Sequence, residues 1–177
     1  MDEHNLAFPI VGIGASAGGL KAFEQFFTGM PPDSDMAFVV IQHLSAPHPS
    51  ILPELIQRFT AMPVVQVTEG IEVEPNRVYV VPPGSDLALK EGHLNLLKPE
   101  TERGSRLPID RFFRSLAQIQ GERAIGIVLS GTLSDGSLAL KSIKAEGGLT
   151  IAQEPGTAEF ADMPRNAIAT KDVDFIL

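Results

Sequence analysis

The sequence predicts an α/β fold, with a doubly wound, mostly parallel, Rossmann-like sheet and an antiparallel β-hairpin excursion in the middle of the chain. Short apolar runs alternate with stretches of helical periodicity, which is the pattern of repeated βαβ units. The run over 37–42 is apolar almost throughout, as expected of a strand buried on both faces of a parallel sheet. The length of 177 residues suits one compact domain, so we expect 1–177 to form a single domain.

In the first third of the chain, the predicted elements alternate between strand and helix. A strand over 8–13 ends in the glycine-rich turn 12–19 and is followed by a helix with an apolar face. The strand over 37–42 leads into a loop over 43–49 and then a helix from about 50 to 60. The apolar face of the first helix is assigned to Leu20, Phe23, Phe26 and Phe27.

The middle of the chain is rich in short strands separated by turn residues. Strands over 64–67, 77–81 and 94–97 are interrupted by Gly, Pro and Asn, which indicates the hairpin excursion. Alternation of helices and strands then returns. The elements predicted there are a helix over 109–120, a strand over 124–129, a helix over 137–145 and strands over 149–153 and 175–177.

Composition excludes several classes of function. The chain has no cysteine, which removes disulfides, thiolate catalysis and cysteine metal sites. Its formal net charge of −8 repels phosphate backbones, so we expect no nucleic-acid partner. No apolar run approaches the roughly 20 residues of a membrane helix, and the start of the chain lacks the features of a signal peptide. We therefore expect a cytoplasmic protein with no membrane insertion and no cofactor.

Ser16 lies in the glycine-rich turn between the first strand and the first helix. Small residues on both sides let the backbone turn sharply, expose the hydroxyl and leave N–H groups free to stabilise an oxyanion. The alternative is that Ser16 only caps the helix.

The same turn satisfies the loose dinucleotide-binding fingerprint as Gly12-x-Gly14-x-x-Ala17. That function requires an acidic residue near the end of the second strand to hold the ribose. The second strand instead ends in Gln42-His43, which argues against a nucleotide.

His43 follows the second strand, where the mouth of a parallel sheet would place a general base. The alternative is a loop histidine bonded to a backbone carbonyl. His43 and His48 make poor zinc spacing without a further His or Cys, so we expect no metal.

Asp135 lies in a Gly/Ser/Thr-rich loop after the most apolar strand, where an aspartate either caps a helix or forms a turn, or else orients a histidine. Together, Ser16, His43 and Asp135 supply a nucleophile, a base and an orienting group, each after a different strand.

Three strings that carry these residues resemble the catalytic domain of the chemotaxis protein-glutamate methylesterases (CheB type). They are IGASAGG over 13–19, VIQH over 40–43 and LSGTLSDG over 129–136. Further similar strings occur in the same order at 80–84, 108–115 and 163–168. The resemblance covers nearly the whole chain and implies a single methylesterase-like catalytic domain with a doubly wound parallel sheet and an antiparallel hairpin.

By this resemblance, Ser16 is the nucleophile, His43 the base and Asp135 its partner, and the N–H groups of Ala17 and Thr132 hold the oxyanion. The implied reaction is hydrolysis of a glutamyl methyl ester on a chemoreceptor helix, and some members also deamidate receptor glutamine. The implied partners are methyl-accepting chemoreceptor helices and a methyltransferase or sensor domain. The alternative function is a catalytically silent domain that binds receptors or partner domains.

The sequence departs from the family at two places. Leu133 stands where the loop before the aspartate usually has glycine, so a positive φ there would strain the leucine. In addition, only about seven residues precede the first predicted strand, so we expect no N-terminal receiver domain, and the strings resemble most closely the variants fused to methyltransferase and sensor domains.

Overall fold

The computed structural model describes residues 5–43, 50–99 and 106–177. The predicted loop over 43–49 lies almost wholly outside them. Along the described chain the elements are β1 (Ile10–Ala15), α1 (Gly19–Gly29), β2 (Ala37–Gln42), α2 (Leu52–Gln57), β3 (Val64–Gln66), β4 (Ile71–Glu72), β5 (Arg77–Val80), β6 (Asp86–Lys90), β7 (His93–Leu97), α3 (Pro108–Gln120), η1 (Gly121–Arg123), β8 (Ala124–Val128), α4 (Leu140–Ala145), β9 (Leu149–Ala152), η2 (Pro155–Thr157), α5 (Asp162–Ala169) and β10 (Phe175–Ile176).

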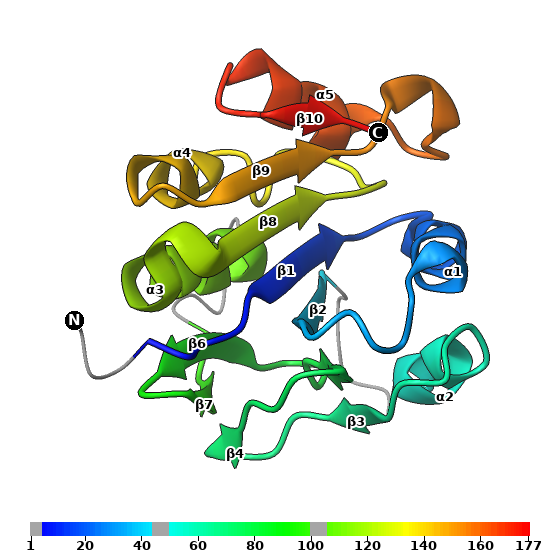
Figure 1. The fold of residues 1–177 in the computed structure, drawn as a ribbon. Coiled ribbons are helices and arrows are strands. Elements are labelled where there is room, and N and C mark those ends of the chain that lie inside the picture. The colour runs from blue at the N-terminus through cyan, green and yellow to red at the C-terminus, as the bar shows by residue number, and fades with distance from the viewer. Residues whose placement is uncertain (1–4, 44–49, 100–105) are drawn as a thin grey trace.

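The central feature is a parallel sheet with the strand order β10-β9-β8-β1-β2-β5-β3 (Figure 1). Every pairing within it is parallel. A second, antiparallel sheet has the order β4-β7-β6. The β6–β7 hairpin turns through Glu91 and Gly92, whose φ angles of 50° and 77° are those of a hairpin turn that matches the strand twist. The predicted α/β class, parallel sheet and hairpin excursion are confirmed.

Helices cover both faces of the parallel sheet, with α1 and α2 on one face and α3 and α4 on the other (Figure 1). Alternate residues of β1 therefore enter two separate cores. Val11 and Ile13 pack in the core that contains Phe23 and Phe27 of α1. Ile10 packs in the core that contains the aromatic residues of α3. This division explains why β1 is buried along its whole length.

Gly12 and Gly14 of β1 allow α3 to lie close to the sheet. A Cβ added at Gly12 would lie 2.9 Å from Cε1 of Phe113, and one added at Gly14 would lie 2.5 Å from Cγ2 of Ile109. Both distances are shorter than van der Waals contact allows. Close helix packing therefore accounts for the Gly-x-Gly spacing without a bound nucleotide.

Several predicted boundaries differ from the structure. Strand β1 continues to Ala15, and the helix predicted over 137–145 begins at Leu140. The helix α5 was not predicted from the sequence, because it is only eight residues long and has a proline at its third position. Leu20, predicted on the apolar face of α1, is 39% exposed, since it lies in the first turn of the helix at the edge of the sheet.

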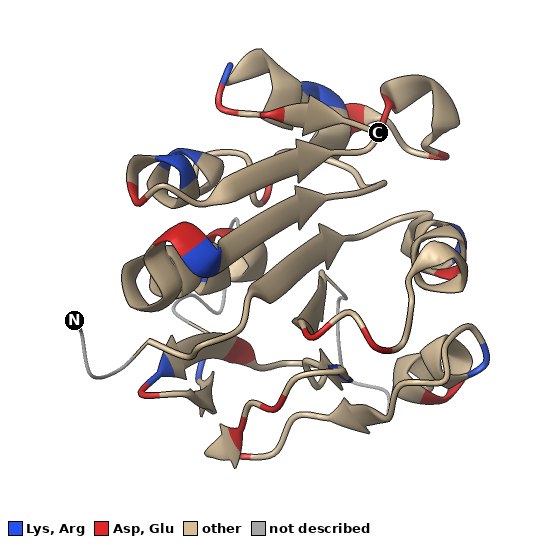
Figure 2. Ribbon diagram, viewed as in Figure 1, with Lys and Arg blue, Asp and Glu red and all other residues tan. Residues whose placement is uncertain are grey.

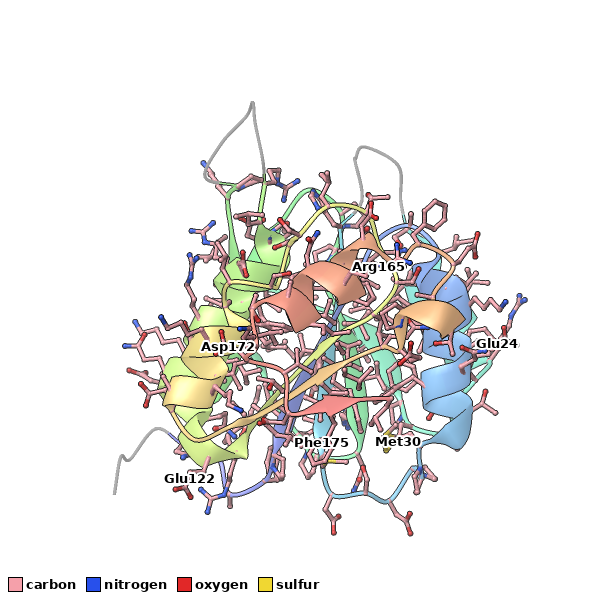
Figure 3. The ribbon with its side chains drawn as sticks, turned by 90° about the horizontal axis from the view of Figure 1, so that it is seen from above. Glu24, Met30, Glu122, Arg165, Asp172 and Phe175 are labelled. Carbon is pink, nitrogen blue, oxygen red and sulfur yellow. The ribbon has the colours of Figure 1, made fainter. Side chains whose placement is uncertain are left out.

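Charged residues lie on the helices, the loops and the small sheet (Figure 2). Strands β1, β2, β8 and β9 carry no Asp, Glu, Lys or Arg. Viewed from above, α5, which carries Arg165, lies beside the edge strand β10, where Phe175 is exposed (Figure 3). Within the described ranges, no helix is both long and apolar enough to span a bilayer.

Candidate active site

The candidate site lies at the carboxyl edge of the parallel sheet, where β1 lies between β2 and β8. The chain leaves β1 through α1 on one face and enters β8 from α3 on the other, so the strand order reverses between β1 and β8. Open α/β sheets bind ligands beyond the carboxyl ends of their strands at such a reversal. Ser16 follows β1, His43 follows β2 and Asp135 lies in the loop after β8. The fold thus brings the three predicted residues to one edge.

The Ser16 hydroxyl lies between a backbone donor and a thioether. Its Oγ accepts a hydrogen bond from the N–H of Thr132 at 3.0 Å and donates to Sδ of Met163 at 3.4 Å. The N–H of Ser16 donates to the carbonyl of Ser130 at 3.0 Å, which fixes the turn to the loop after β8. Ser16 is 9% exposed, so little water competes for its hydroxyl.

Ser16 does not cap α1. The N-cap residue is Gly18, in the left-handed region with φ 73°, and no side chain caps that helix. Close approach of the β8 loop instead explains the position of the hydroxyl, because a Cβ added at Gly131 would lie 2.5 Å from Ser16 Oγ. The helix-cap alternative is therefore wrong.

His43 lies beside Asp135 with its side chain about one third exposed. Its ring Nδ1 is 3.9 Å from Oδ2 of Asp135, and its backbone N–H donates to the carbonyl of Ala15 at 3.0 Å. Burial lowers the pKa of His43 below its ordinary 6.5, the positive charge of Arg106 lowers it further, and Asp86 opposes both. These effects favour the neutral imidazole that a general base requires. No hydrogen bond joins His43 to Ser16, both of which lie within the described chain.

Asp135 caps the N-terminus of α3. Its Oδ2 accepts from the N–H of Ile109 and its Oδ1 from the N–H of Asp110, each at 3.0 Å. These donors and the helix dipole favour the carboxylate. Burial opposes them and raises the pKa of Asp135 to about 7. The aspartate is 2% exposed, and its two hydrogen bonds to α3 fix its position relative to the sheet.

Arg106 is held near His43 by a buried carboxylate. Asp86, 5% exposed, accepts from Nη2 of Arg106 at 2.8 Å and from Nη1 of Arg111 at 2.9 Å. His43, Pro83 and Arg106 line one small hollow at this edge of the sheet. In the sequence, Arg106 and Arg111 only indicate a possible local basic patch. Their ion pairs with Asp86 were not predicted, because the partners lie 20 and 25 residues apart in the chain.

Ser130 and Met163 are two further neighbours of the site that sequence reasoning did not assign. Ser130 Oγ donates to the carbonyl of Ala17 at 2.8 Å and accepts from the N–H of Phe160 at 3.0 Å. Met163 belongs to α5, which was not predicted as a helix. The signal for both was present only in the family-like strings 129–136 and 163–168.

Leu133, which stands where the family usually has glycine, adopts the positive φ that strains a leucine. Its φ is 65°, and its side chain is 71% exposed. The loop is nevertheless held, because the carbonyl of Leu133 accepts from Nδ2 of Asn166 at 2.8 Å. Thr132, directly before it, still places its N–H on the Ser16 hydroxyl.

No cluster of three or more metal-ligating side chains occurs in the parts of the chain that the structure describes. His48, the second histidine weighed as a metal ligand, lies outside those parts.

The family model of the CheB methylesterases matches residues 11–177. The chain belongs to the CheB methylesterase family. A relative from Leptospira interrogans is 33% identical over 93% of this chain and 86% of its own length. A protein-glutamate methylesterase/protein-glutamine glutaminase of Geobacter sulfurreducens is 33% identical over 95% of this chain, which spans 46% of that relative. The crystal structure of the CheB methylesterase catalytic domain of Thermotoga maritima superimposes with a TM-score of 0.89 at 24% identity, over 97% of this chain and 93% of that chain, and has the same fold.

Proposed function

We propose that this CheB-family domain is a serine hydrolase that removes methyl groups from glutamyl methyl esters on chemoreceptors. The observation that carries the proposal is the contact of the Ser16 hydroxyl with the Thr132 N–H at the carboxyl edge of the sheet, beside the His43–Asp135 pair. Acyl transfer requires a hydroxyl close to a backbone N–H donor and to a base, and the nearly buried Ser16 hydroxyl has such a donor.

In this proposal, Ser16 is the nucleophile and its Oγ forms a bond to the ester carbonyl carbon. His43 takes the hydroxyl proton and then gives it to the departing methoxide, which leaves as methanol. Water attacks the acyl-enzyme with His43 as base, releasing the glutamate side chain and restoring Ser16. The N–H groups of Thr132 and Ala17 stabilise the oxyanion at each tetrahedral stage.

The resting hydroxyl is directed to Met163 rather than to His43. The proposed cycle therefore includes a rotation of Ser16 about χ1, which carries Oγ towards the imidazole when substrate enters. Catalytic hydrogen bonds are often loose before substrate binds and tighten in the complex. We expect the distance between His43 Nδ1 and Asp135 Oδ2, which is 3.9 Å, to shorten in the same step.

The proposed substrate is a methyl-accepting helix of a chemoreceptor, and deamidation of receptor glutamine is a second proposed activity. Names of relatives support both reactions. We further propose that 1–177 acts as one catalytic domain in the cytoplasm, where it cooperates with a methyltransferase or sensor domain. The proposed mechanism uses no cofactor.

Methanol release from methylated receptor membranes tests the proposal. The wild-type domain should release methanol, whereas Ser16→Ala should release none above background and should retain its melting temperature, since Ser16 does not cap α1. The control Thr28→Ala, which removes an exposed hydroxyl from α1, should behave as wild type. Full activity of Ser16→Ala would refute the assignment of the nucleophile.

A further inference from the structure

Asp110 is a buried carboxyl beside the site to which the proposed mechanism gives no role. It lies in the first turn of α3 and is 1% exposed. Its Oδ1 accepts from the N–H of Ala139 at 2.9 Å. Its Oδ2 is buried and has no hydrogen-bond partner among the residues that the structure describes. An unpartnered buried carboxylate oxygen is costly, so it calls for an explanation.

Asp110 and Asp135 each hold the backbone of the other's segment. Oδ1 of Asp135 accepts the N–H of Asp110, while Oδ1 of Asp110 accepts the N–H of Ala139, which follows Asp135 in the same loop. The loop after β8 and the first turn of α3 are thus joined in both directions. One consequence is that two buried carboxyl groups lie next to each other.

The two carboxyl groups interact electrostatically. Burial raises the pKa of both, and the charge of Asp110 raises that of Asp135 further. Arg114, one turn along α3, lowers the pKa of Asp110. From the other side, the His43 ring faces Asp135, and His43 is itself acted on by the charges of Arg106 and Asp86.

We propose that Asp110 is a positioning residue for Asp135: it holds the Asp135 loop against α3, and its negative charge governs how readily Asp135 carries the charge that stabilises His43. This inference rests on the proposed function, in which Asp135 must be ionised to support the imidazolium. It assigns the unpartnered oxygen of Asp110 an electrostatic role instead of a hydrogen-bonding one.

The test compares two substitutions that separate the hydrogen bond from the charge. Asp110→Asn keeps an Oδ1 acceptor for Ala139 and removes the charge. The acid limb of its pH–rate profile should move to lower pH by about one unit, the size expected for loss of a close like charge. Asp110→Ala removes the acceptor as well and should lower kcat at every pH, to below that of Asp110→Asn. The control Asp162→Asn removes an exposed charge from the first turn of α5 and should leave the limb in place.

Carbon-13 NMR titration of the Asp135 carboxyl provides a readout that does not depend on turnover. Its midpoint should fall in Asp110→Asn and stay constant in Asp162→Asn. An unmoved or raised midpoint, or equal rate profiles for the Asn and Ala variants, would overturn the inference. If the wild-type domain hydrolyses no receptor ester while the midpoint still falls, the proposed function fails and the coupling between the two carboxyls stands.

Discussion

Replacing Leu133 separates the effect of a strained backbone from the effect of an exposed apolar side chain. The left-handed conformation costs an ordinary L-residue about 1 kcal/mol, and Leu133 has φ 65°. Leu133→Gly removes that cost but adds freedom to the unfolded chain worth roughly 0.5–1 kcal/mol. The two effects nearly cancel, and the 71% exposed side chain gives up little packing. The melting temperature should therefore change by only a few degrees.

The effect of Leu133→Gly on activity should depend on the substrate. Thr132 already places its N–H 3.0 Å from Ser16 Oγ, so the leucine does not displace the loop, and hydrolysis of a small, unselective ester should be unchanged. On methylated receptors, loss of the apolar contact should cost about 1 kcal/mol, which corresponds to about a fivefold fall in kcat/KM.

The assays are absorbance for the small ester and methanol release for the receptor, with Leu133→Met as the control that keeps both the apolar surface and the positive φ. A rise in small-ester turnover on Leu133→Gly would show that the leucine does distort the loop. No change on either substrate would refute a role in gripping the receptor.

Three other expectations follow from the same geometry. Ser16→Ala and His43→Ala should each abolish ester hydrolysis, and the double variant should be no slower, because the groups act as a unit; additive losses in single-turnover rates would contradict this. The kcat/KM should fall as pH drops through about 7, because Asp135 keeps its proton up to that pH; a profile that stays flat from pH 6 to 8 would exclude a requirement for the Asp135 carboxylate. Gly14→Ala should displace the start of α3 and with it the donors to Asp135, lowering kcat by about 10²-fold. The control Gly29→Ala lies at the end of α1, where an added Cβ has no neighbour within 4 Å, and it should match wild type in the same assay.

Patterns with a strong period made most of the fold predictable from sequence. The apolar run over 37–42 coincides with β2, and the helix predicted over 109–120 differs from α3 by one residue. The helix is long enough for its period to be unambiguous, and the strand is a short apolar run rich in β-branched residues that follows a turn-forming segment. The strands β4 and β6 were not predicted, because β4 has two residues and β6 mixes charged with apolar positions.

The family resemblance supplied the N–H groups of Ala17 and Thr132, and the residue pattern itself predicted only the three side chains of the candidate site. Each of them follows a strand at the carboxyl edge, a position that sequence order and a parallel sheet already specify. The contacts of Met163 and Asp110 were not predictable from the sequence, since they depend on how α5 and the start of α3 pack against the loop after β8. Such contacts between segments distant in the chain leave no local pattern.

A glycine in β1 and another in the loop after β8 connect the packing of the sheet to the placement of the proposed catalytic groups. Gly14 lets α3 approach β1, and the first N–H groups of α3 then reach the carboxylate of Asp135. Gly131 lets the loop after β8 approach the end of β1, and the next N–H of that loop, from Thr132, reaches the Ser16 hydroxyl. The proposed nucleophile Ser16 and the proposed partner Asp135 are thus positioned by separate close contacts, one on each side of the switch between β1 and β8. Because each contact depends on the absence of a single Cβ, the local sequence at both places is restricted more tightly than the surrounding core, where apolar residues of similar size can replace one another.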